Sequence, residues 1–218
     1  MKKISKKKSD LNSNIDDFDI KFKNKFVKTS ALTKKGIKTL KNYLDKKSPE
    51  NLYEPIQYIL NLGGKRIRPL LVLMSADLFG HKYKEAVSAA LAVEIFHNFT
   101  LAHDDIMDNS MLRRGKKTIN SKWDNNTGIL SGDVMLIISY EVLNQYQDSK
   151  YIHLSKKLTE ISRLVCEGQQ ADMDFSSKNN ITENEYFDMI KNKTAVLIAC
   201  SFMFGGIVAE ANDLNTDL

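Results

Sequence analysis

Apolar side chains recur at helical spacing along most of this chain. Residues 31–47 show the pattern simply, with apolar residues that would share one helical face: Leu32, Ile37, Leu40, Tyr43 and Leu44. The same periodicity predicts helices over residues 52–62, 70–79, 85–108, 131–146, 154–173 and 183–206. No stretch alternates strictly between apolar and polar residues, and the sequence has no internal repeat or βαβ unit. The pattern therefore predicts an all-α fold.

Capping and turn residues set the expected helix boundaries. Pro49 suits a helix start, and the pair at 63–64, Gly-Gly, suits a helix end. Thr182 and Glu185 form a capping-box pattern before the last predicted helix. Residues 109–127 are expected to form a loop in which Trp123 packs as an anchor.

Length and composition narrow the class of protein. The chain has 218 residues, enough for one domain with a substantial core. No apolar run approaches the ~20 residues of a membrane span, and none follows the basic start MKKISKKKSD, so we expect a cytoplasmic protein with no transmembrane segment. Cys166 and Cys200 lack metal-ligand spacing and are expected in the core of a protein from a reducing compartment.

Positive charge is concentrated at the N-terminus. The first 50 residues hold 15 Lys against 6 Asp and Glu, whereas residues 51–218 hold 17 Lys and Arg against 21 Asp and Glu. Such a segment could meet nucleic acid or an anionic membrane surface. It has no aromatic residue before Phe18 and no recognisable binding pattern. We therefore expect a flexible, solvated leader over residues 1–30, no nucleic-acid partner, and a folded domain over residues 31–218.

The stretch HNFTLAHDDIMDNSMLRRG, residues 97–115, carries the strongest candidate chemistry. A helix places Asp104 and Asp108 on one face, where they repel unless a cation lies between them. Magnesium is usually held by one or two carboxylates together with substrate phosphates. Arg113 and Arg114 follow, and guanidinium groups bind phosphate oxygens in a bidentate way. The stretch therefore predicts a site for Mg2+ and a diphosphate.

A solvated surface with local salt bridges is the competing interpretation. It fits poorly, because the acidic run continues a stretch with large apolar residues: Ile95, Phe96, Phe99 and Leu101. A wholly solvated helix would not carry them.

Arginine use points to a second anion site. The chain has 27 Lys and 5 Arg, and four of the five arginines stand at 66, 68, 113 and 114. In GGKRIRP, residues 63–69, glycines let the backbone approach a ligand closely, and Lys65 and Arg68 would point the same way. The alternative is a helix–loop–helix corner with solvated cations. Because a strongly apolar helix follows and would hold the cations rigidly, we interpret the motif, with its three cations, as a phosphate or diphosphate pocket.

Two later segments are weaker signals on their own. Gln169 and Asp172 are three apart, on one helical face. Lys193 precedes an apolar run and, taken alone, is typical of a surface lysine whose stem packs on apolar neighbours.

Together these motifs resemble those of the trans-isoprenyl diphosphate synthases, the polyprenyl synthetase family. The shared motifs follow the family's order over roughly residues 50–210: GGKRIRP, the DDxxD of HDDIMD, RRG, GD at 132–133, GQ at 168–169 and KT at 193–194. The ordered set is far more specific than any one motif.

The resemblance implies an isoprenoid-synthase-type helical bundle around a deep central cavity, usually as a homodimer. It also implies a prenyltransferase of isoprenoid biosynthesis. In that reaction an allylic diphosphate ionises, isopentenyl diphosphate attacks the carbocation head to tail, and a proton is lost. Mg2+ and cationic side chains would stabilise the departing diphosphate, and an apolar cavity would shield the cation from water.

The resemblance also assigns roles to individual residues. Asp104 and Asp108 are implied magnesium ligands supported by Asp105, and Arg113 is an implied contact of the allylic diphosphate. The implied isopentenyl diphosphate pocket consists of Lys65, Arg68, His97 and Arg114. Further residues are implied on the allylic side: Lys193, Thr194, Gln169 and Asp172, the last as a metal ligand.

Product length is expected to depend on Phe99, five residues before Asp104, with the small Thr100 beside it. The growing tail would run along the helix upstream of Asp104, about 5.4 Å per turn. An aromatic residue at this depth resembles short-chain synthases, so we expect C15–C20 products.

The sequence departs from the family after residue 210. The family's second aspartate-rich motif is not found, and Asp213 and Asp217 lie in a segment that does not resemble it. We therefore expect a C-terminally truncated synthase domain, about two-thirds of the family's length. The alternative is a non-catalytic fragment or a regulatory subunit that pairs with a complete synthase. A terpene cyclase is disfavoured, since GGKRIRP would have no isopentenyl diphosphate to hold.

Overall fold

The computed structural model describes residues 24–80, 83–178 and 180–210, and it confirms the all-α prediction. A helix over residues 24–44 precedes the labelled elements. The α-helices that follow are α2 (Glu50–Asn61), α3 (Ile67–Leu78), α4 (Val87–Met107), α5 (Ile119–Lys122), α6 (Asn125–Glu141), α7 (Asp148–Phe175), α8 (Glu183–Ile190) and α9 (Val196–Val208). Two 3-10 turns, η1 (Tyr83–Ala86) and η2 (Val142–Gln145), and one π-helical turn, η3 (Lys191–Ala195), connect them.

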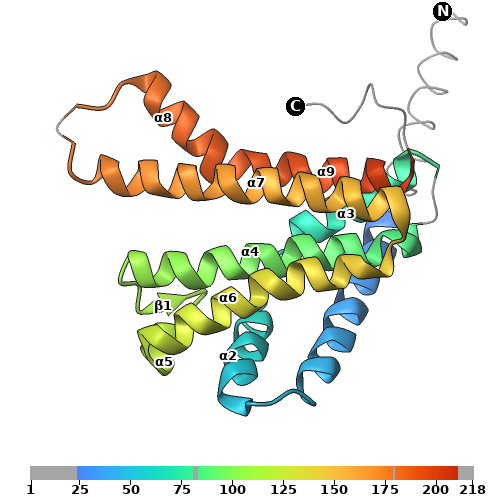
Figure 1. Cartoon of the computed structure of the whole chain (residues 1–218), viewed down its shortest axis with the longest axis horizontal. Coiled ribbons are helices and arrows are strands. Elements are labelled where there is room, and N and C mark those ends of the chain that lie inside the picture. The colour runs from blue at the N-terminus through green and yellow to red at the C-terminus, as the bar shows by residue number, and fades with distance from the viewer. Residues whose placement is uncertain (1–23, 81–82, 179, 211–218) are drawn as a thin grey trace, which may run out of the picture.

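Helix α4 is the centre of the bundle. It packs against α6 and also contacts α3, α9 and α2, and Figure 1 shows α4 and α6 running side by side. Its N-terminal half is lined with fully buried small residues, Ala89, Ala90 and Ala92, which let neighbouring helices approach closely. Phe96 and Phe99 then fill the core nearer the acidic end.

Helices α3 and α9 cross at very close range. A Cβ built on Gly205 of α9 would lie within 3.0 Å of the Val72 carbonyl oxygen and the Ala76 amide nitrogen of α3. The hydroxyl of Ser75 donates to the Phe202 carbonyl across the same crossing, at 2.7 Å. This contact fixes the start of α3, and with it the GGKRIRP segment, relative to the last helix.

Several predicted boundaries were wrong by a few residues. The first helix already covers residue 24, before the predicted start at 31. The predicted helix over 85–108 opens as the 3-10 turn η1, and the helix after Trp123 begins at Asn125 rather than near Ser131, because Asp124 caps it by accepting from the Thr127 amide. The division into a leader and a domain stays a prediction.

The predicted loop over residues 109–127 contains short regular elements. Strands β1 (Leu112–Arg113) and β2 (Lys116–Lys117) form an antiparallel hairpin, and they are the only strands in the described part of the chain. Helix α5 follows, and Trp123 packs edge-on against Tyr58, as an anchor should. The hairpin is too short to give an alternating pattern in the sequence.

The last helical stretch is also interrupted. The capping box at Thr182 and Glu185 is confirmed, with both of its hydrogen bonds present. The helix then passes through η3 before α9, and periodicity alone did not predict this π-helical turn. Among the described residues, no helix is long and apolar enough to cross a membrane.

We predict that Gly205→Ala destabilises the fold by about 1–3 kcal/mol, since the added methyl group forces two helix backbones apart. Gly36→Ala is the matched control. It also adds a methyl group within a helix, but there the new Cβ meets only side-chain carbons of Val87 and Leu91 at 3.3 Å. Its unfolding free energy should stay within about 1 kcal/mol of wild type. Equal effects in urea denaturation would contradict the close crossing.

Candidate diphosphate and metal site

The acidic end of α4 is neutralised by an arginine from the β1–β2 hairpin. Asp105 is buried, and Arg113 Nε donates to both of its carboxylate oxygens at 2.9 Å. The same guanidinium reaches Asp104 Oδ2 at 3.4 Å. Burial raises the pKa of Asp105, and Arg113 opposes that shift. Arg113 thus fixes the hairpin against α4 through both Asp105 and Asp104.

Lys193 reaches Asp104 from the opposite wall. Its Nζ donates to Asp172 of α7 at 2.5 Å and lies 3.4 Å from Asp104 Oδ1. Burial lowers the pKa of Lys193, but its hydrogen bond to Asp172 and the charge of Asp104 outweigh that effect, so the net shift is upward. Lys193 is therefore a firmly charged group that joins α4, α7 and η3.

Gly168 makes this arrangement possible. A Cβ at that position would lie within 3.0 Å of the Lys193 backbone. Only glycine lets η3 come this close to α7, and π-helical turns of this kind are frequent at functional sites. The glycine of the predicted GQ pair is thus a packing residue that places Lys193.

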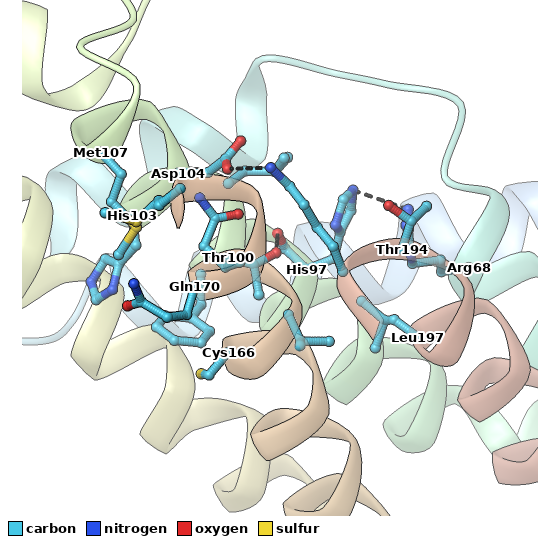
Figure 2. Close-up of a pocket in the computed structure, with 16 residues that line it drawn as sticks. Arg68, His97, Thr100, His103, Asp104, Met107, Cys166, Gln170, Thr194 and Leu197 are labelled. Atoms are coloured by element: carbon cyan, nitrogen blue, oxygen red, sulfur yellow. Dashed lines mark hydrogen bonds and ion pairs between the residues drawn. The ribbon is translucent and has the colours of Figure 1, made fainter. Parts of the chain in front are cut away.

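A cavity of about 350 Å³ opens between α4, α7 and the start of α9. Besides Asp104, six predicted site residues line it: Arg68, His97, Phe99, Gln169, Lys193 and Thr194. In Figure 2, His103 and Gln170 lie on one side, and Arg68, His97 and Thr194 on the other. The apolar part of the wall comes from Leu101, Val165 and Leu197.

Two buried polar atoms in this cavity wall, Arg68 Nε and Gln169 Nε2, lack a hydrogen-bond partner. A third, Asp104 Oδ1, accepts no hydrogen bond and has only its ion pair with Lys193, at 3.4 Å. An unpartnered buried polar group costs about 1–3 kcal/mol. Donors and acceptors held in this way are suited to a polar ligand that enters the cavity.

A second cavity of about 390 Å³ adjoins the first. It is lined by all four residues predicted for the second anion pocket: Lys65, Arg68, His97 and Arg114. Arg114 lies over Gly64, where any Cβ would come within 3.0 Å of the guanidinium, and donates to the Gly63 carbonyl. The two cavities share Arg68 and His97.

Arg66 differs from its neighbours in GGKRIRP. Its guanidinium is ion-paired with buried Glu94 and donates to the Leu60 carbonyl at 2.6 Å. The backbone of Arg66 is left-handed, with φ of 51°, which turns this side chain into the core. All three cations of the motif line the second cavity, Lys65, Arg66 and Arg68, but the charge of Arg66 is balanced there by Glu94, which lines the same cavity.

His97 is the neutral member of the second cavity. Its Nε2 lies 3.2 Å from Arg68 Nη1. Burial lowers the pKa of His97 to about 3, and the positive charges of Arg68 and Arg114 add to the effect. At neutral pH the imidazole can accept from the guanidinium without adding to the local repulsion between cations.

The predicted metal ligands lie at one end of the bundle. Asp108 caps α4, and it lines a hollow together with Asp172 of α7; Asp104 faces the same α7 residue through Lys193. No group of three or more His, Cys, Asp or Glu side chains in the described ranges is arranged to hold a metal by itself. A few carboxylates would fill only part of the coordination sphere of Mg2+. This fits that ion, because it takes its remaining ligands from water and phosphate.

Phe99 lies where the sequence placed it. It is buried in the wall of the first cavity, one helical turn and a half below Asp104. Its ring packs on Phe96 at 5.4 Å between centroids and on His103 at 4.8 Å. An aromatic pair of this kind holds the ring in one orientation.

The sequence reasoning missed His103 and misplaced Cys166. Cys166 is exposed in the first cavity, which corrects the expectation of a core position, whereas Cys200 is buried as expected. The spacing of Cys166 from Gln169 and Gln170 could have revealed the shared helical face. His103 stands directly before Asp104 and was overlooked because the carboxylates dominated that stretch.

Comparison with known proteins gives a consistent result. The polyprenyl synthetase family model matches residues 49–218. Geranylgeranyl diphosphate synthase of Saccharolobus solfataricus is 44% identical over 179 residues, which cover 80% of this chain and 53% of that protein. The chain therefore spans about half the length of the curated relatives it matches.

Solved structures agree with the sequence relatives. One crystal structure of geranylgeranyl pyrophosphate synthase is 48% identical with a TM-score of 0.81, over 85% of this chain and 57% of that one. Geranylgeranyl pyrophosphate synthetase from Pyrococcus horikoshii has a TM-score of 0.84 at 33% identity, over 90% of this chain and 61% of that one.

We predict that His97 makes the fold sensitive to acid. Its pKa is about 3 in the folded chain and near 6.5 when unfolded. The unfolded state therefore binds a proton first, and stability falls as the pH drops from about 6.5 towards 3. In urea denaturation over this window, His97→Gln should lose less stability than wild type. Identical pH slopes for the two proteins would contradict a buried, neutral His97.

Proposed function

This chain belongs to the polyprenyl synthetase family, and we propose that it condenses isopentenyl diphosphate with an allylic diphosphate. One observation carries the proposal: an anion pocket and an apolar cavity with an acidic mouth adjoin each other and share Arg68 and His97. A reaction that joins two diphosphate esters needs two such sites side by side.

The anion pocket would hold isopentenyl diphosphate. Lys65, Arg68 and Arg114 supply three cations at its wall, while the neutral His97 limits their mutual repulsion. Arg66 also lines this pocket, but its charge is balanced by Glu94. The carbon end of the bound substrate would then project past Arg68 into the first cavity.

The acidic mouth would hold the allylic diphosphate through Mg2+. Asp104, Asp108 and Asp172 are the proposed ligands, and carboxylate oxygens are the ligands that this ion prefers. The bound ion would supply electrostatic stabilisation of the diphosphate as it leaves. Arg113 keeps Asp105 in place, and Lys193 with Gln169 would contact the diphosphate oxygens directly.

The apolar cavity would receive the hydrocarbon tail and exclude water from the carbocation. Leu101, Val165 and Leu197 give this cavity its aliphatic surface, and the thiol of Cys166 lines the same cavity. Phe99 lies on the path of a tail that runs along α4 from Asp104. On this basis we keep the expectation of C15–C20 products, formed by a Mg2+-dependent, cytoplasmic homodimer.

A non-catalytic subunit that pairs with a complete synthase is the second candidate. Helices α3 and α9 leave large apolar side chains exposed, Leu78 at 78% and Phe202 at 48%. Exposed apolar groups of this size favour a protein partner. Under this proposal the chain alone would bind diphosphates without turning them over.

We predict that the 218-residue chain forms product from isopentenyl and farnesyl diphosphates only when Mg2+ is added. Asp104→Asn should lower kcat by about 10²–10³-fold, because it removes a charge that acts on the leaving group. Asp45→Asn is the matched control. Asp45 is exposed in a turn, is distant in sequence from Asp104, and its substitution should keep wild-type activity. Turnover that survives Asp104→Asn would refute the proposed metal site.

We also predict that Phe99→Ala shifts the products to longer chains, since it removes a ring from the path of the tail. One extra isoprene unit or more is expected when products are separated by chromatography. Phe187→Ala is a suitable control, because this exposed phenylalanine does not line the cavity. An unchanged product length with Phe99→Ala would mean that the tail takes another path.

A further inference from the structure

The aromatic ring of His103 lies between the cavity and helix α6. Its Nε2 donates to the Ile129 carbonyl at 3.1 Å and lies 3.7 Å from Asp133 Oδ1. On its other side the ring meets Phe99 edge-on, with 4.8 Å between centroids. His103 and Phe99 both line the first cavity.

Gly132 provides the space for this ring. A Cβ on Gly132 would lie within 3.0 Å of Nε2 and Cδ2 of His103. Any other residue at 132 would therefore push the imidazole away from α6. Because the cavity lies on the far side of the ring, the displaced imidazole would move into the space that is proposed to hold the tail.

The orientation of Phe99 depends on the same contact. Phe99 and His103 are one helical turn apart on α4, so their side chains stack along one face. Phe96 supports Phe99 from the core side, and His103 supports it from the side of Asp104. The position of Phe99 is thus set by a chain of contacts that ends at Gly132.

We propose that His103 is a specificity-determining residue for the length of the prenyl tail, and that Gly132 is the positioning residue that seats it against α6. The inference rests on the proposed function, since it needs a tail in the first cavity. It also explains the GD pair at 132–133, because Gly132 makes room for the imidazole and Asp133 lies beside it.

The two residues should act in opposite directions. His103→Ala removes the ring, widens the cavity and frees Phe99, so longer tails should be accepted. Gly132→Ala pushes the ring inward, so shorter tails should be favoured. A loss of general stability would not produce opposite shifts, and this separates a specificity role from a merely structural one.

The test compares two probes in the presence of Mg2+, farnesyl and geranylgeranyl thiolodiphosphates, which resist ionisation. Isothermal titration calorimetry gives the ratio of their Kd values for wild type and each variant. We expect His103→Ala to shift that ratio about tenfold towards the longer probe, and Gly132→Ala a similar amount towards the shorter one. Phe99→Ala is the reference for a cavity that has been lengthened.

The outcomes separate this inference from the proposed function. If wild type binds neither probe, the proposed function fails and the inference fails with it. If wild type binds both and Phe99→Ala shifts the ratio while His103→Ala does not, the inference alone is overturned. Where circular dichroism shows that Gly132→Ala is unfolded, His103→Ala decides, with His103→Gln expected to stay closer to wild type.

Discussion

The charge compensation at the acidic end of α4 is the constraint on which the rest of the site depends. Three carboxylates within five residues of one helix repel one another, and Asp105 is buried. Folding is favourable only if cations approach from outside the helix. Arg113 comes from the hairpin and Lys193 from the π-helical turn, so two distant segments of the chain must converge on this point. The same convergence builds the mouth of the cavity.

Helices α4 and α7 both line the cavity that opens at this mouth. Met107 and Met173 line one hollow at the acidic end, and seven residues earlier on each helix Thr100 and Cys166 line the first cavity. Met107 and Met173 line the first cavity as well, so α4 and α7 both contribute to its wall over these two turns. A ligand anchored at the mouth is guided between them, so the diphosphate end and the tail end are recognised by different levels of the same pair of helices.

Sequence reasoning succeeded for structural features that depend only on residues close together in the chain. The helical periodicity and the capping box at Thr182 were both visible, because each depends on neighbours in the chain. The same reasoning did not foresee the ion pairs of Arg113 with Asp105 or of Arg66 with Glu94, although Arg66 has the same charge as Arg68. The left-handed backbone at Arg66 determines that difference, and no spacing rule marks it.

The close contacts between helices could not be predicted from the spacing of residues in the sequence. Gly132, Gly168 and Gly205 each face an atom that belongs to a different helix or turn, and each contact excludes even a methyl group. A helical glycine costs about 1 kcal/mol relative to alanine, so three of them in helices need a tertiary reason. The neighbouring group gives that reason. Gly132 faces the imidazole of His103, Gly168 faces the backbone of Lys193, and Gly205 faces α3, the helix that carries Arg68. These three glycines therefore mark points where the bundle must close tightly enough to place its functional side chains.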